Sequence, residues 1–429
     1  MPVEIVAIDG LEVLDSRGNP TVEVSVTLSD GTRGKASVPS GASTSQNEAL
    51  ELRDRDDSRF GGLGVRHALK NIAEQIRPPL LGRDPCAQVE IDRLMIELDG
   101  TANKSLLGAN AILGVSMAVA RTAALSLHTP LYRYLGGAQA TRLPVPLMNV
   151  INGGKHAPNR LEFQEFMIVP HGAPNFSEAL RWATEIFHTL RTNLQREGYS
   201  VGIGDEGGFA PDLEDNEEAC ELILLAIRDA GYEPGKQVSI ALDPAATSFF
   251  HDSNYDVPTA RGELKSAEAL LHLYERWVRD YPIVLIEDGF AETAWSAFQK
   301  QTELMGDRVV VVGDDLYATN PALIRKGIAR KATNAALIKL NQIGTVTETI
   351  EAIELCRNAG WRYVISHRSG ETTDDFIADF AVAMDGGLLK AGSLCRGERV
   401  AKYNRLLEIE HELGLAARYA DPFARTGAR

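Results

Sequence analysis

The sequence is poor in cysteine and carries no excess of positive charge. Its four cysteines, at positions 86, 220, 356 and 395, show no Cys-x-x-Cys spacing, which is typical of reduced thiols in a cytoplasmic protein. Lysine and arginine number 44 against 59 aspartates and glutamates, giving a net charge of −15. Such a chain has no general attraction for nucleic acid or anionic membranes, so any bound anion needs a local site or a metal.

Long hydrophobic runs are also missing. The longest uncharged stretch, residues 105–120, is too short and too interrupted by glycine to span a membrane. The first ten residues, MPVEIVAIDG, contain Glu4 and Asp9 and no basic segment, so no secretory signal is expected. The sequence therefore predicts a cytoplasmic protein with no membrane span.

The first part of the chain predicts a small α+β domain, residues 1–135. Apolar and polar residues alternate over residues 22–28, as in a half-buried strand, and residues 3–14 and 35–38 are candidate partner strands. Helical patterns follow, ending with a long apolar segment over residues 110–127. That segment is expected to be a helix buried between layers.

The remainder, residues 136–429, predicts a β/α barrel. Short apolar runs alternate with helical stretches, and runs that are apolar on both faces are typical of buried parallel strands. The runs cover residues 237–243, 283–287, 309–314, 335–340, 363–367 and 388–392. Strand–helix alternation repeated in this way favours a closed parallel barrel of the (β/α)8 type.

A polar or charged residue stands at or near the end of each of these runs. They are Asp243, Glu287, Asp314, Lys339, His367 and Lys390. Any one of them could simply cap a strand, but the carboxyl ends of barrel strands converge on one pocket. Six such residues at equivalent strand ends therefore predict a functional site.

The three acids of this set predict a metal site. Asp243, Glu287 and Asp314 would repel one another without a cation, and oxygen ligands without cysteine suit Mg²⁺ or Mn²⁺. Pairing of one or more of them with arginine is the alternative. Lys339 and Lys390 could act as a base and an anion clamp, since a lysine near another cation has its ammonium form disfavoured. Salt bridges to the acids are an equally good interpretation of both lysines.

Three loops add further candidates. His367, Arg368 and Ser369 precede Gly370 in a loop suited to phosphate or carboxylate. Glu206 lies in the glycine-rich segment 204–208, which could present an acid or be a simple solvated turn. A mobile loop bearing His156 precedes Gln164 and Glu165 and could close over a ligand.

These residues carry a resemblance that covers nearly the whole chain. The matching motifs are DSRGNPTVEV (15–24), SGAST (40–44), LGANAILGVS (107–116), QEFM (164–167), GDEGGFAPDL (204–213), VGDDL (312–316), NQIGT (341–345), SHRSGET (366–372) and AKYN (401–404). With them the sequence resembles the enolase family. The resemblance implies a small α+β domain followed by an enolase-superfamily barrel. The implied activity is the Mg²⁺-dependent, reversible dehydration of 2-phosphoglycerate to phosphoenolpyruvate, a hydro-lyase step of glycolysis and gluconeogenesis.

The resemblance also implies a role for each candidate residue. Asp243, Glu287 and Asp314 resemble the ligands of a first Mg²⁺, and Ser40 resembles the contact to a second Mg²⁺ that arrives with substrate. Lys339 resembles the base that removes the proton next to the carboxylate, and Lys390 a residue that stabilises the charge this creates. Glu206 resembles the acid that assists loss of the hydroxyl, and it is expected to stay protonated beside Glu165. The resemblance also implies catalytic roles for His156, as the histidine of a lid, and for Glu165. The residues that it implies in substrate binding are His156, Gln164, Glu165, His367, Arg368, Ser369, Lys390 and Ser40. A homodimer or an octamer is implied as well.

A few positions depart from the usual family pattern. Ser45 and Gly289 replace a usual glycine and proline, Pro244 follows the first acid, and Thr247-Ser248-Phe249 replaces Ser-Glu-Phe. Two alternatives therefore stay open. One is an enolase-like paralogue with a related phospho- or phosphono-carboxylate substrate, such as a carboxyphosphonoenolpyruvate synthase. The other is a non-catalytic binding protein with the enolase fold.

Overall fold

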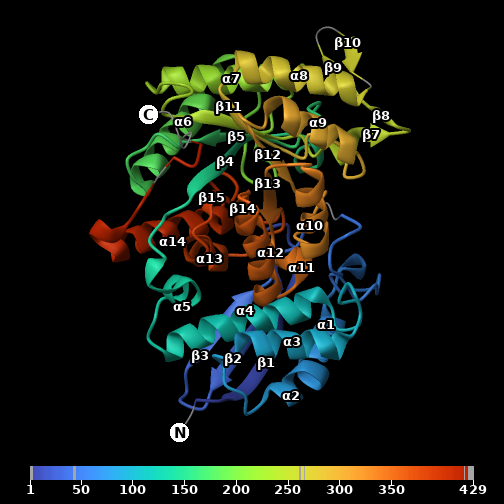
Figure 1. Ribbon diagram of the computed structural model, residues 1–429, viewed down its shortest axis with the longest axis vertical. Helices are drawn as coiled ribbons and strands as arrows, with labels where there is room; N and C mark the ends of the chain where they lie inside the picture. The colour runs from blue at the N-terminus through green and yellow to red at the C-terminus, as the bar shows by residue number, and fades with distance from the viewer. Residues whose placement is uncertain (1–2, 42–44, 260–261, 265, 420, 424–429) are drawn as a thin grey trace.

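The computed structural model describes residues 3–41, 45–259, 262–264, 266–419 and 421–423 (Figure 1). The small domain begins with a three-stranded antiparallel sheet in the order β1–β2–β3. Its strands are β1 (Ile5–Leu14), β2 (Pro20–Leu28) and β3 (Arg33–Ser37). The helices that follow are α1 (Arg66–Asn71), α2 (Arg77–Leu80), α3 (Gln88–Asp99), α4 (Ala109–Ser126) and α5 (Leu131–Gly136). The predicted α+β architecture of this part is confirmed.

Helix α4 is the core helix of this domain, as its apolar sequence predicts. It packs on the sheet so closely that a Cβ atom at Gly114 would lie 2.7 Å from Val24 Cγ2. By length and composition α4 could cross a membrane, but 83% of its 18-residue window is buried inside the protein. Burial of this kind is what a core helix shows, and α4 lies between the sheet and the barrel (Figure 1).

The second part is a closed eight-stranded barrel in the order β11–β12–β13–β14–β15–β4–β5–β6. The strands in chain order are β4 (Val145–Asn152), β5 (Glu165–Val169), β6 (Ser239–Asp243), β11 (Ile283–Glu287), β12 (Val310–Gly313), β13 (Ala335–Ile338), β14 (Arg362–Ser366) and β15 (Gly387–Lys390). The helices are α6 (Phe176–Arg196), α7 (Asn216–Asp229), α8 (Ala267–Asp280), α9 (Trp295–Met305), α10 (Pro321–Arg330), α11 (Leu340–Ile343), α12 (Val346–Asn358), α13 (Phe376–Ala383) and α14 (Gly397–Leu413). The six strands predicted from the apolar runs are β6 and β11–β15. Two short hairpins, β7 (Phe250–His251) with β8 (Asn254–Tyr255) and β9 (Val257–Thr259) with β10 (Gly262–Leu264), lie between β6 and α8.

The expectation of an all-parallel barrel is wrong at one strand. Strand β5 runs antiparallel to both β4 and β6. The connection between β4 and β5, residues 153–164, contains only the turn Gly154–His156, and a parallel pair needs a longer crossover, usually a helix. The reversal brings the first residue of β5, Glu165, into register with the last residues of its neighbours, Asn152 and Asp243.

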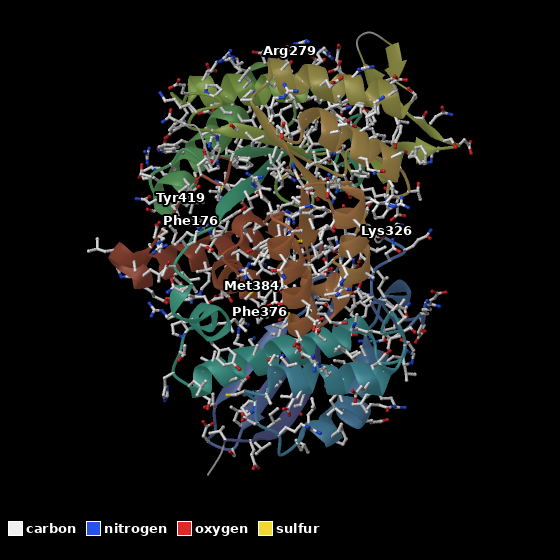
Figure 2. The ribbon with its side chains drawn as sticks, viewed as in Figure 1. Phe176, Arg279, Lys326, Phe376, Met384 and Tyr419 are labelled. Carbon is white, nitrogen blue, oxygen red and sulfur yellow. The ribbon has the colours of Figure 1, made fainter. Side chains whose placement is uncertain are left out.

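The C-terminal segment covers the opposite end of the barrel. The interior of the barrel is filled by side chains such as Val145 and Met167, and Tyr419 and Phe423 pack against this cluster. The Tyr419 hydroxyl donates a hydrogen bond to the carbonyl oxygen of Pro170 at 3.0 Å (Figure 2). The barrel is therefore closed at this end, and the polar strand ends lie at the other.

Candidate active site

A polar cavity opens at the barrel edge where the strand ends converge. Its lining is formed by His156, Gln164, Glu165, Glu206, Asp243, Ala245, Asp288, Asp314, Asp315, Lys339, Ser366, His367, Arg368, Ser369 and Lys390. Among the described residues, this lining includes every predicted site residue except Glu287 and Ser40. Glu287 lies beneath it, fully buried and bonded to Lys390. Side chains that are far apart in the sequence thus share one site, as their positions at strand ends predict.

Lys390 is the centre of the charged network beneath the cavity. Its Nζ atom lies 2.9 Å from Asp243 Oδ2, 2.9 Å from Glu287 Oε2 and 3.0 Å from Glu165 Oε1. Burial lowers the pKa of Lys390, but the surrounding carboxylates, Asp243 first among them, outweigh burial and raise the pKa well above its ordinary value. This lysine therefore carries a positive charge, and its three ion pairs agree with the salt-bridge interpretation of its role.

Lys339 is paired with the third predicted metal ligand. Its Nζ atom lies 2.5 Å from Asp314 Oδ2, and Gln342 donates to Asp314 Oδ1 at 3.0 Å. Burial and the neighbouring cations lower the pKa of Lys339, but Asp314 raises it by more, so the pKa lies above its ordinary value. Among the protein's own groups the closest neighbour of Lys339 is therefore an anion, and the expectation that positive neighbours, the metals among them, favour its neutral form stays a prediction.

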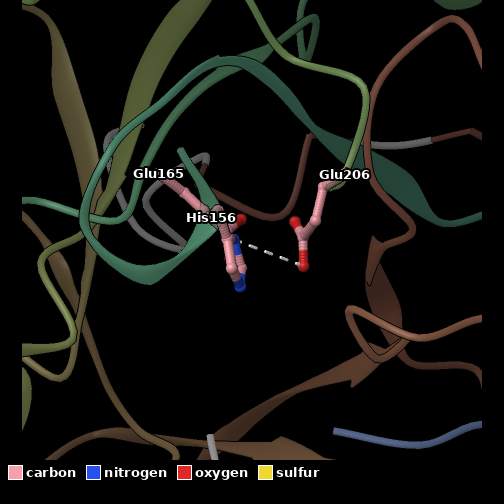
Figure 3. Close-up of side chains that lie close together, drawn as sticks. All are labelled: His156, Glu165 and Glu206. Carbon is pink, nitrogen blue, oxygen red and sulfur yellow. Dashed lines mark ion pairs between the residues drawn. The ribbon is translucent and has the colours of Figure 1, made fainter. Parts of the chain in front are cut away.

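Two buried carboxylates face His156 on the other side of the cavity (Figure 3). His156 Nδ1 lies 3.8 Å from Glu206 Oε1 and 3.9 Å from Glu165 Oε1. Burial and the charge of Glu206 raise the pKa of Glu165 well above its usual range. Burial also acts to raise the pKa of Glu206, but His367 and His156 outweigh it and lower that pKa. Of the two carboxyl groups, Glu165 therefore has the higher pKa among the protein's own groups, and the protonation of Glu206 expected from the sequence stays a prediction.

The predicted anion site depends on a residue that sequence reasoning missed. Arg368 Nη1 donates to Glu48 Oε2 at 3.0 Å and to Asn341 Oδ1 at 3.0 Å. Glu48 belongs to the small domain and lies four residues after the SGAST motif, but no spacing or pattern marks it as a partner of Arg368. Another missed residue is Arg399, whose side chain is entirely buried behind this loop.

Ser40 lies outside the cavity lining. Its hydroxyl donates to Glu51 Oε2 at 3.0 Å and accepts from Arg53 at 2.9 Å. Its backbone exchanges two hydrogen bonds of 2.8 Å with Gly370. Residues 42–44 of the SGAST motif fall outside the described residues.

The donor set of the cavity fits a divalent cation. The acidic residues in the lining are Glu165, Glu206, Asp243, Asp288, Asp314 and Asp315, and the basic ones besides histidine are Lys339, Arg368 and Lys390. Six acids so close together repel one another, and hard oxygen ligands at such a site favour Mg²⁺. Asp288, Asp314 and Asp315 also offer ligand atoms within 4.8 Å of one another, although the Asp288 oxygens accept from the backbone N–H groups of residues 314 and 315.

Comparison with known proteins gives matches over both domains. The family described as "Enolase, N-terminal domain" matches residues 5–135, and "Enolase, C-terminal TIM barrel domain" matches residues 140–426. The chain is 58% identical over 419 residues to "Enolase 1" of Methylococcus capsulatus, covering 98% of this chain and 100% of the relative. It is also 58% identical over 417 residues to "Enolase" of Desulfotalea psychrophila, covering 97% of this chain and 99% of that relative.

Proposed function

The chain belongs to the enolase family, and on this premise we propose how its residues dehydrate 2-phosphoglycerate to phosphoenolpyruvate. Membership makes it a magnesium-binding lyase of glycolysis. The chain is 58% identical to two enolases over nearly its full length, which favours this activity over the two alternatives, a paralogue with another substrate and a non-catalytic binding protein. The departures at Ser45, Pro244 and Gly289 are consistent with it, because none of these residues lines the described cavity.

The proposal rests mainly on the placement of a base and an acid on opposite sides of one cavity. Lys339 follows β13, and Glu206 lies beside β4 through a hydrogen bond from Asn149 at 3.1 Å. In the barrel order, β13 is separated from β4 by β14 and β15. Lys339, as the free amine, would take the proton next to the carboxylate of 2-phosphoglycerate. Glu206 would then give a proton to the leaving hydroxyl, which departs as water.

The opposite pKa shifts of Glu165 and Glu206 suggest how the acid is supplied. The two carboxyl groups face the same imidazole, His156, and two close carboxyl groups hold one proton more readily than none. We infer that Glu165 stores this proton in the resting site and that Glu206 carries it when the hydroxyl leaves. Gln164 and His156 would contact the substrate from the same side.

The negative charge that develops on the substrate needs stabilisation. Removal of the proton places a second negative charge on the carboxylate, which Lys390 would stabilise from beneath the cavity. Asp243, Glu287 and Asp314 would hold the first Mg²⁺, and Ser40 would contact a second. When bound, Mg²⁺ supplies positive charge to the substrate carboxylate and competes with the two lysines for the oxygens of these acids.

A direct assay tests the function. With 2-phosphoglycerate and Mg²⁺, the ultraviolet absorbance of the enol product should rise, and a chelator should stop the reaction. A phosphono-carboxylate offered in place of 2-phosphoglycerate serves as the comparison substrate. Faster turnover of that compound, or no turnover of 2-phosphoglycerate with Mg²⁺ present, would contradict the proposal.

Arg368→Ala is expected to raise the KM for 2-phosphoglycerate by about 10- to 100-fold, with a smaller effect on kcat. The guanidinium would bind the phosphate together with Ser369, and a charged hydrogen bond contributes about 1.5–3 kcal/mol. Steady-state kinetics and the affinity for a phosphonate analogue measure the effect. Arg121→Ala is the matched control, since Arg121 also pairs with a buried acid, Asp374, but does not line the cavity. An unchanged KM for Arg368→Ala would exclude the phosphate role.

Assembly, location and domain division complete the proposal. Strand β1 exposes the apolar side chains of Val6, Leu11 and Leu14 at 50%, 58% and 57%, and the family resemblance favours a homodimer or a higher assembly such as an octamer. The four cysteines are free, in keeping with a cytoplasmic protein.

We propose that the small domain ends at residue 135 and the catalytic barrel begins at residue 136.

A further inference from the structure

Arg399 joins two loops of the site without lining the cavity. It lies in the first turn of α14, and its side chain is completely buried. Its Nη1 atom lies 2.6 Å from His367 Nδ1 and 2.6 Å from the carbonyl oxygen of Arg368. Its Nη2 atom lies 2.5 Å from the carbonyl oxygen of Ser369 and 3.1 Å from that of Asp205.

The contact with His367 fixes which ring nitrogen carries a proton. Arginine donates hydrogen bonds and cannot accept them, so His367 Nδ1 has to be the acceptor. Burial lowers the pKa of His367 to about 4, so the ring is neutral at pH 7 and has a single N–H group. That proton is therefore on Nε2, which lies 3.3 Å from Glu206 Oε2.

We propose that Arg399 is a positioning residue that holds His367 as the Nε2–H tautomer, so that the proton of the ring is on the nitrogen nearest the carboxyl group of Glu206. The consequence for the reaction rests on the proposed function, in which Glu206 handles the proton of the leaving hydroxyl. With the other tautomer, a lone pair on Nε2 would face the Glu206 carboxylate. The anion would then be destabilised and its orientation lost.

The surrounding sequence leaves room for this arrangement. A Cβ atom at Gly392 would lie 2.7 Å from Arg399 Cδ and 3.0 Å from the carbonyl oxygen of Glu206. Gly392 also has a positive φ of 83°, a conformation that glycine adopts without strain. The close packing of Arg399 against the Glu206 loop thus depends on a residue without a side chain.

Nitrogen NMR of the whole protein labelled with ¹⁵N-histidine tests the tautomer directly. His367→Gln identifies the signals of residue 367 by their absence. In the unaltered protein at pH 7, Nε2 is expected to be protonated and Nδ1 unprotonated. In Arg399→Met, the share of the Nδ1–H form should rise at least about tenfold. A protonated Nδ1 in the unaltered protein would overturn the proposal, and so would an Arg399→Met protein with the same tautomer. This result does not depend on which substrate the protein uses.

Kinetics then distinguish positioning from simple support of the loops. Arg399→Met is expected to lower dehydration about 100-fold while keeping much of the exchange of the substrate α-proton with deuterium. Arg399→Lys, which keeps one donor, should recover part of the loss. Arg405→Met is the matched control, because Arg405 lies on the same helix and pairs with Asp379 away from the site. Equal loss of exchange and dehydration in Arg399→Met, or the same pattern in Arg405→Met, would show a structural role only.

Discussion

Replacement of Lys339 by alanine is expected to lower exchange of the substrate α-proton with deuterium by about 10⁴-fold, and to abolish product formation with it. The side chain follows β13 at the edge of the cavity, and a positioned base contributes about 10²–10⁴ to such a step. NMR of 2-phosphoglycerate in deuterated water measures the exchange directly. In the proposed reaction, removal of the proton is the first chemical step.

Two further variants give this prediction its controls. Glu206→Gln should lose dehydration but keep much of the exchange, because proton removal precedes loss of the hydroxyl. Lys402→Met should keep both activities near the level of the unaltered protein. Lys402 is fully buried, more deeply than Lys339, and pairs with Glu371 at 2.8 Å, but it does not line the cavity. Exchange at the original rate in Lys339→Ala, or equal loss of exchange in the Lys339 and Glu206 variants, would contradict the assigned roles.

Asp314→Ala is expected to remove the tight Mg²⁺ site and reduce turnover to about 1% or less. Asp314 is one of the acids that the resemblance assigns to the metal, and it also pairs with Lys339. Its loss leaves an incomplete set of oxygen ligands and removes a charge partner of the base. Titration calorimetry with Mg²⁺, together with turnover at trace and millimolar metal, measures both effects.

Asp379→Asn provides the comparison for the metal prediction. Asp379 is buried and pairs with Arg405, so its replacement also removes a buried charge, but at a distance from the cavity lining. We expect this variant to bind Mg²⁺ with unchanged affinity. If Asp314→Ala keeps the original turnover at trace metal, Asp314 is not a ligand.

The sequence predicted the six strands whose carboxyl ends supply most of the site, because each is a short apolar run with a polar residue at or near its end. It did not predict β4 and β5 from the apolar pattern. The direction of β5 follows from a short connection, so no feature of the strand itself reveals it. Without that reversal, the side chain of Glu165 has no evident reason to meet Asp243 and Lys390.

Charge contacts were predicted less completely than position. Sequence reasoning counted the charges that would surround Lys339 and Glu206, but it could not show which atom lies closest to each group. Asp314 Oδ2 lies 2.5 Å from Lys339 Nζ and raises the pKa of the lysine. The roles of Glu48 and Arg399 were missed for a related reason, since both depend on how loops from distant parts of the chain pack together.

Charged side chains of the small domain pair with charged side chains of the barrel across the boundary between the two domains. Ion pairs cross it at Glu48–Arg368, Arg121–Asp374 and Lys104–Glu348, with distances of 3.0, 2.9 and 2.9 Å, and Glu48–Arg368 is the most buried, with side-chain exposures of 8% and 3%. Phe376 of α13, labelled in Figure 2, also lies under the guanidinium of Arg121. A chimaera that joined this small domain to the barrel of a relative would have to inherit each pair intact, because breaking a buried pair typically costs about 3–5 kcal/mol. A substitution at Glu48 in the small domain therefore also alters the surroundings of Arg368, the barrel residue that we propose binds phosphate.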